Sequence, residues 1–190
     1  MKTHNLAFID VETTGLDADK HELIEIGCVL ARQVSQEGKG PSIEVLDEFE
    51  YKIIPEHLET ADLESLAING YTAEKWASAI PLAEAMGKFS ERVRGASFVA
   101  HNAFFDYEFI DHAFKKTGAR NFMHYHRLDT ISIAFAKLYD VPEVEKFSLR
   151  FLCEYFGITN KNAHTALSDA RATFEVYKKL LNVIDFRDES

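Results

Sequence analysis

The chain has 190 residues, of which 46% are hydrophobic and 27% are charged, and its formal net charge is −10. This composition predicts one globular domain over residues 1–190, with a core from about residue 6 to residue 183, and the acidic balance disfavours long, non-specific binding of duplex nucleic acid. No apolar run approaches the roughly 20 residues that span a bilayer, and no signal peptide is evident, so we expect a cytoplasmic protein without a membrane segment. Cys28 and Cys153 lie in apolar stretches, which favours buried thiols in a reducing compartment; a disulfide between them is the alternative.

The first part of the chain has the pattern of a strand meander. LAFIDVE, residues 6–12, is typical of a buried strand, and residues 22–34 and 42–54 contain alternating apolar and polar positions. The glycine-containing segment SQEGKGP between these two predicts a hairpin loop. Residues 58–80 are mixed and indicate short helical pieces.

Helices and strands alternate over the remainder. A helix is predicted over residues 81–93, with Pro81 in its first turn, and another over residues 103–118, with Asn102 as N-cap and Gly118 at its end. The other predicted elements are strands over 96–102 and 121–129 and helices over 130–139, 148–157 and about 165–184, the last with Ala166, Ala170, Phe174, Tyr177 and Leu181 on one face. This order indicates an α/β fold with a meander at the front, and by itself it does not distinguish among mixed-sheet folds.

Two acidic residues interrupt the first predicted strand. Asp10 and Glu12 are two positions apart, so their carboxylates leave the same face of the strand. Thr13, Thr14 and Gly15 follow, and we expect Gly15 to permit a backbone path that is closed to other residues and to let a ligand approach the main chain. The alternative is a strand end with solvated acids.

Two further acids and a histidine lie at helix beginnings. Asp106 lies about one turn into its predicted helix, where the helix dipole alone would favour a negative charge, and the aromatic residues around it, Phe105 among them, are able to stack on a nucleobase. His164 and Asp169 are five positions apart, which excludes a common helical face. We therefore expect His164 on the loop before the last helix and Asp169 in its second turn; a surface histidine is the alternative.

The four carboxylates, if they converge, require compensation. An ionised carboxylate that faces an apolar interior costs several kcal/mol unless a partner offsets the charge. Hard divalent cations such as Mg²⁺ or Mn²⁺ suit an all-oxygen ligand set. The sequence therefore predicts a metal site formed by Asp10, Glu12, Asp106 and Asp169, beside a histidine whose ordinary pKa is suited to proton transfer.

The segments FIDVETTGL, VAHNAFFDYEF and NAHTALSDARAT together resemble the three motifs of the DEDDh, or DnaQ-like, 3′–5′ exonucleases, a family that includes the DNA polymerase III epsilon-type proofreading exonucleases. The resemblance implies a ribonuclease-H-like fold, with a five-stranded mixed sheet whose first three strands are antiparallel, flanked by helices. It implies a two-metal mechanism with Mg²⁺ or Mn²⁺. In that mechanism His164 is the general base, and the catalytic residues are Asp10, Glu12, Asp106, His164 and Asp169.

The same resemblance implies how a substrate is held. The expected contacts to the terminal nucleotide are Thr13, Thr14, Gly15, Leu16, Asn102 and Phe105. The expected partners are single-stranded or frayed 3′ ends of DNA or RNA, and a polymerase, for a chain that is a monomer or a homodimer. One departure from the family is Ile68-Asn69-Gly70, where members with a polymerase partner often carry His-Gly.

Alternatives to an enzyme remain open at this point. The chain would also fit a non-catalytic module of the same fold that binds a polymerase or a nucleic-acid end, or a structural domain stabilised by a divalent cation. His124 and His126 alternate on a predicted strand, but no Cys or acid at ligand spacing joins them, which favours a structural role. Lys146, Arg150 and Lys161 form a weaker hypothesis for contacts to a substrate backbone.

Overall fold

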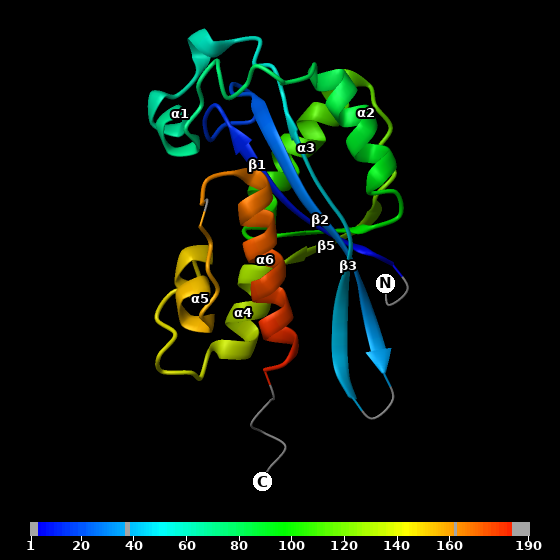
Figure 1. The fold of residues 1–190 in the computed structure, drawn as a ribbon, viewed down its shortest axis with the longest axis vertical. Coiled ribbons are helices and arrows are strands. Elements are labelled where there is room, and N and C mark those ends of the chain that lie inside the picture. Colours follow the sequence, from blue (N-terminus) through cyan, green and yellow to red (C-terminus); the bar gives the residue numbers. More distant parts are fainter. Residues whose placement is uncertain (1–3, 37–38, 162, 184–190) are drawn as a thin grey trace.

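The sheet has five strands in the order β3-β2-β1-β4-β5 (Figure 1). The structure, a computed structural model, describes residues 4–36, 39–161 and 163–183. The first three strands form the predicted antiparallel meander, and the last two run parallel to β1. Their bounds are β1 Leu6–Thr13, β2 Leu23–Gln36, β3 Lys39–Lys52, β4 Ser97–Ala100 and β5 His124–Asp129.

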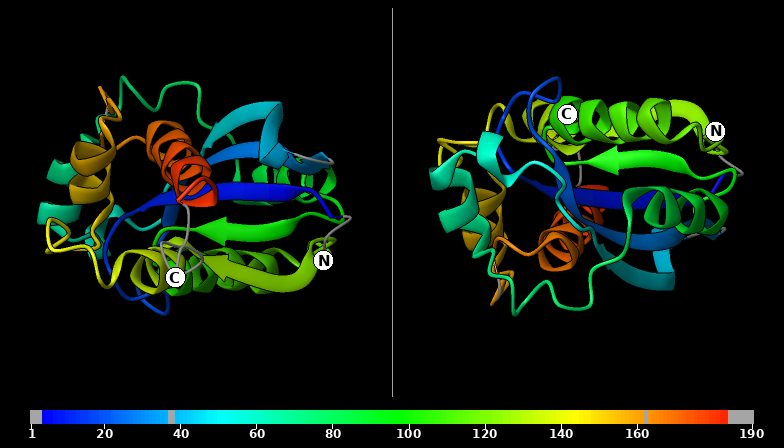
Figure 2. Two further views of the ribbon diagram at one scale, coloured as in Figure 1. Left: turned by 90° about the horizontal axis from the view of Figure 1, so that it is seen from below. Right: turned by 90° about the horizontal axis from the view of Figure 1, so that it is seen from above.

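Helices cover both faces of this sheet. In Figure 2, α3 and α6 lie on opposite sides of β1 and β4. The helical segments are η1 Leu58–Thr60, α1 Leu63–Asn69, α2 Leu82–Arg92, α3 Ala103–Thr117, α4 Thr130–Leu138, α5 Leu149–Phe156 and α6 Ala166–Leu181. α2 and α3 pack with one face of the sheet in the largest apolar cluster, while α6 packs on the other face and shares a smaller cluster with α4 and α5.

The alternation of β1 decides where its acids point. Ala7, Ile9 and Val11 belong to the cluster on the α2–α3 face, whereas Leu6 and Phe8 pack against α6. The Phe8 ring meets Phe174 and Tyr177 edge to face at 5.3 and 5.2 Å between centroids. Because side chains alternate along a strand, Asp10 and Glu12 continue the Leu6–Phe8 row on the α6 face.

The helix ends agree with the predictions except in how they are capped. Pro81 is the N-cap of α2 and does not lie inside its first turn. Asn102 is the N-cap of α3, as predicted, but its side chain makes no capping hydrogen bond; the Asp129 carboxylate instead accepts from the N–H of Ala103 at 2.7 Å. The same carboxylate accepts from the N–H of Ser132 at 2.7 Å, so Asp129 caps α3 and α4 together.

The two thiols are buried and free, and they lie in different apolar clusters. This confirms the buried thiols that the sequence favoured over a disulfide. Within the described part of the chain, every helix is too short or too polar to cross a membrane.

Candidate active site

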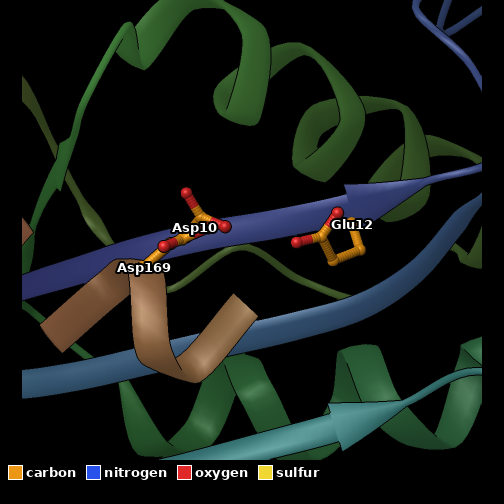
Figure 3. Close-up of side chains that lie close together, drawn as sticks. All are labelled: Asp10, Glu12 and Asp169. Carbon is orange, nitrogen blue, oxygen red and sulfur yellow. The ribbon is translucent and has the colours of Figure 1, made fainter. Parts of the chain in front are cut away.

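Three carboxylates from two distant parts of the chain meet at the end of β1. Asp10 and Glu12 lie on β1 and Asp169 on α6, and one oxygen of each lies within 4.8 Å of the others (Figure 3). Figure 3 shows Asp169 extending from α6 toward Asp10, with Glu12 farther along β1. The predicted convergence of these acids is therefore present in the fold.

The electrostatics of this group favour a cation. Burial, with the charges of Asp169 and Glu25, raises the pKa of Glu12 to about 8. Burial and the neighbouring Asp106, Asp169 and Glu12 charges hold the pKa of Asp10 well above its usual range. Carboxyl groups that lie close together where water is scarce are costly to ionise. A bound divalent cation offsets this cost and favours their ionised form. The all-carboxylate donor set fits Mg²⁺ or Mn²⁺ better than softer metals.

Asp106 lies beside the three-carboxylate group and is not a member of it. It is in the first turn of α3, as predicted, and its residue is only 3% exposed. Its Oδ1 accepts from the N–H of Val11 at 3.0 Å, and burial raises its pKa to about 8 despite that hydrogen bond. The structure thus joins three of the four predicted ligands and ties the fourth to the backbone of β1 next to them.

Asp169 is oriented by the loop that precedes α6. Its Oδ1 accepts from the side-chain amide of Asn160, and its Oδ2 accepts from the backbone N–H of His164 at 3.0 Å. Ser168 donates to Asn160 Oδ1 at 2.7 Å, which fixes the amide. Asp169 lies in the first turn of α6; the predicted second turn was wrong because the helix begins at Ala166. Asn160 was not among the predicted site residues, and its only signal in the sequence is its place in a polar loop.

His164 occupies the loop before α6, as predicted. Its residue is exposed, and its backbone is left-handed with φ 69°. Histidine is one of the non-glycine residues that adopt this conformation more often than most. The backbone of His164 therefore supports Asp169, and its ring is not part of the carboxylate group.

Glu25 is a buried acid that was likewise not among the predicted site residues. It lies opposite Glu12 in the β1–β2 register and is 1% exposed, and burial raises its pKa. Its Oε1 accepts from the N–H of Ala166 at 3.1 Å, so it caps the first turn of α6 from β2. Its signal in the sequence is an acidic residue between Ile24 and Ile26. Asp10 likewise interrupts an apolar strand.

Gly27 allows α6 to approach the sheet at this place. A Cβ added to Gly27 would lie 2.2 Å from the backbone carbon of Ala166. Gly27 is paired with Asp10 in the register, so the helix that carries Asp169 approaches the sheet closely beside Asp10. The close approach therefore contributes directly to the geometry of the three-carboxylate group.

The turn after β1 is held from several sides. Thr13 and Thr14 are buried; Thr13 Oγ1 donates to the Gly15 carbonyl at 2.6 Å, and Thr14 Oγ1 accepts from the N–H of Glu22 at 2.8 Å. The Asn69 amide of α1 donates to the Thr13 carbonyl at 3.0 Å, so the segment that departs from the family supports this turn.

The reason for glycine at position 15 differs from the expected one. Gly15 is not among the positive-φ glycines, so no special backbone path explains it. A Cβ there would lie 2.4 Å from the His21 ring, and packing against His21 explains the glycine. Leu16 is next and is 74% exposed, which leaves an apolar side chain at the open side of the turn.

The two remaining predicted substrate contacts lie around the start of α3. Asn102 is exposed, with a left-handed backbone. Phe105 is partly exposed and packs on Phe109 at 5.1 Å between ring centroids, whereas its neighbour Phe104 is 78% exposed. The roles of Asn102 and Phe105 in binding stay predictions.

Comparisons with known proteins place this geometry in context. A family model described as exonuclease matches residues 7–177. Similar curated proteins include the DNA polymerase III PolC-type of Caldanaerobacter subterraneus subsp. tengcongensis, 33% identical over 172 residues that are 90% of this chain and 11% of the relative. That of Thermotoga maritima is 30% identical over 176 residues, 93% of this chain and 12% of the relative. The chain therefore spans about a tenth of the length of the curated relatives that it matches.

Solved structures show the same architecture. E. coli exonuclease I in complex with a dT13 oligonucleotide superposes with a TM-score of 0.77 at 18% identity, covering 95% of this chain and 42% of that chain. Exonuclease I from Methylocaldum szegediense gives a TM-score of 0.71 at 22% identity, covering 94% and 42%. At such identities the likeness concerns the fold alone, and it confirms the predicted ribonuclease-H-like architecture.

Proposed function

Because the chain belongs to the exonuclease family, whose model matches residues 7–177, we propose that it is a metal-dependent 3′–5′ exonuclease. It would hydrolyse the terminal phosphodiester of DNA or RNA and release 5′-mononucleotides. The observation that carries this proposal is the group of Asp10, Glu12 and Asp169, whose oxygens lie within 4.8 Å of one another at the end of β1.

Each residue of the site has a proposed task. Asp10, Glu12 and Asp169 would hold Mg²⁺ or Mn²⁺, and Asp106 would serve a second ion through its other carboxylate oxygen or through water. Such a pair of ions, when bound, supplies Lewis-acid stabilisation of the attacking and leaving oxygens. His164, exposed on its loop, takes the proton from the attacking water.

The turn after β1 is proposed to hold the terminal nucleotide. The buried Thr13 and Thr14 fix the backbone there, Gly15 keeps it close to the His21 ring, and Leu16 presents an exposed apolar surface to a base or sugar. Asn102 and Phe105 would contact the same nucleotide from the start of α3. A single-stranded or frayed end fits this short site, and it fits the net charge of −10 better than a long duplex does.

DNA is the favoured substrate, and a polymerase the favoured partner. The curated relatives are DNA polymerases, and the similar solved structure contains a dT13 oligonucleotide. RNA is retained as a second substrate class, because a protein distinguishes RNA from DNA by contacts to the 2′-OH and the sequence motifs do not encode such contacts.

The test is a degradation ladder from 5′-labelled single-stranded DNA, matched RNA and a mismatched-end duplex in Mg²⁺. The chain should shorten its substrate from the 3′ end, and Asp10→Asn should abolish this. Asp111→Asn, which removes a carboxylate that pairs with Lys115 on α3, should retain it. His164→Ala should lower kcat by about 10²–10⁴-fold while Mn²⁺ still binds.

Two outcomes would contradict the proposal. Undiminished hydrolysis by Asp10→Asn would remove the carboxylate site from the reaction. Binding of the oligonucleotide in Ca²⁺ with no hydrolysis by the unmodified chain in Mg²⁺ or Mn²⁺ would instead support the non-catalytic module.

A further inference from the structure

Three histidines gather at the opposite end of the sheet from the carboxylates. His124 and His126 alternate on β5, and the fold brings His4, just before β1, against them. The ring centroids of His4 and His124 lie 3.9 Å apart, and those of His124 and His126 lie 4.7 Å apart. No further ligand lies near His124 and His126 in the sequence, and the fold supplies a third imidazole from His4, 120 positions away.

The hydrogen bonds around these rings decide which nitrogens carry protons. His4 Nδ1 lies 3.2 Å from the Gly95 carbonyl, which only accepts, so Nδ1 is the donor and Nε2 keeps its lone pair. His124 Nδ1 accepts from the backbone N–H of His126 at 3.3 Å, so its lone pair points to that N–H and a metal ion would replace this long hydrogen bond. Metal-binding imidazoles usually donate their other ring N–H to a carbonyl or a carboxylate, and His4 does so through Nδ1.

The spacing of two of the nitrogens, which share one proton in a hydrogen bond, suits a tetrahedral ion that replaces this proton. Nδ1 of His126 lies 3.2 Å from Nδ1 of His124. Two nitrogens that each bind a tetrahedral Zn²⁺ at 2.0–2.1 Å are about 3.3 Å apart.

We propose that His4, His124 and His126 bind one borderline divalent transition-metal ion of the Zn²⁺, Ni²⁺ or Cu²⁺ class. The rings of His124 and His126 are stacked and that of His4 is tilted against His124, and the three do not yet surround a common point. Binding therefore turns these partly exposed rings about χ2. Imidazole selects such ions over Mg²⁺ and Mn²⁺, which the carboxylates prefer.

This site is separate from the carboxylate group. His4 precedes Asp10 by six residues along β1, which corresponds to roughly 20 Å of extended strand. Its ion would join the segment before β1 to β5 across β4, and so would stabilise the edge of the sheet. The proposal does not depend on whether the chain is a nuclease.

The test is calorimetric titration of Zn²⁺ into the full, untagged chain in excess Mg²⁺. The titration is repeated with Asp10→Asn, so that zinc bound by the carboxylates is recognised. We expect one zinc equivalent that survives Asp10→Asn and that raises the Tm. Affinity should fall by more than about 100-fold in His124→Ala and by about 10–100-fold in His4→Gln.

His57→Ala is the matched control, because His57 is exposed and pairs with Glu59 at 2.9 Å. It should bind zinc as the unmodified chain does. Should His124→Ala fail to fold, as circular dichroism in EDTA would show, His4→Gln decides, since His4 precedes β1 and takes no part in strand pairing. Zinc binding that is unchanged in His4→Gln, or absent from Asp10→Asn, would overturn the proposal.

Discussion

Replacing Glu12 with glutamine should stabilise the metal-free chain at neutral pH. Burial, with the charges of Asp169 and Glu25, raises the pKa of Glu12 from 4.5 to about 8. Glutamine has nearly the same shape and never ionises. It also removes one of the charges that hold the pKa of Asp10 well above its usual range.

The sign of the effect follows from proton binding. The unfolded chain releases the Glu12 proton near pH 4.5, whereas the folded, metal-free chain keeps it until about pH 8. The unfolded state therefore binds fewer protons in this window, and the free energy of unfolding falls as pH rises through it. Near neutral pH the loss from this one group is about 3 kcal/mol, which corresponds to roughly 6–12 °C in Tm for a chain of this size.

The assay is urea unfolding in EDTA at about pH 5 and about pH 8, followed by the same titrations in Mg²⁺. The unmodified chain should lose stability between the two pH values, and Glu12→Gln should lose less. Mg²⁺ should restore stability to the unmodified chain and do so less for the variant, because binding to the folded state alone stabilises it.

Glu145→Gln is the control, since Glu145 is exposed. It should follow the unmodified chain at both pH values. If Glu12→Gln and Glu145→Gln lost equal stability between the two pH values in EDTA, the carboxylate group would not carry the electrostatic cost that its burial indicates.

Two further predictions concern residues that support the site. Gly15→Ala should destabilise the turn after β1, because the new Cβ would lie 2.4 Å from the His21 ring. His21→Ala should relieve this, and a double-mutant cycle by urea unfolding should give a coupling of about 0.5–3 kcal/mol; simple additivity would contradict the packing account. Asn160→Ala should weaken Mn²⁺ binding by about 10–100-fold, because Asp169 loses the amide that orients it. Calorimetry checks this against Asn121→Ala, which lies away from the site, and equal affinities would show that Asn160 does not position Asp169.

Local patterns in the sequence determined the helices and strands, and they determined which face of β1 carries Asp10 and Glu12. A short apolar run identified β1, and the alternation of side chains along a strand put Asp10 and Glu12 on one face. The apolar row of α6 was readable from Ala170, Phe174 and Tyr177, which do pack against β1 and β2. Such patterns are local because side-chain direction repeats within a few residues of a strand or a helix.

The tertiary structure alone decided which distant groups share a space. It tied Asp106 to the Val11 amide, placed Glu25 under the first turn of α6, and brought His4 against His124. These partners are separated by 95, 141 and 120 positions, and no periodicity connects them. Their meeting depends on strand order, register and the approach of α6 at Gly27, all of which result from packing of the whole chain.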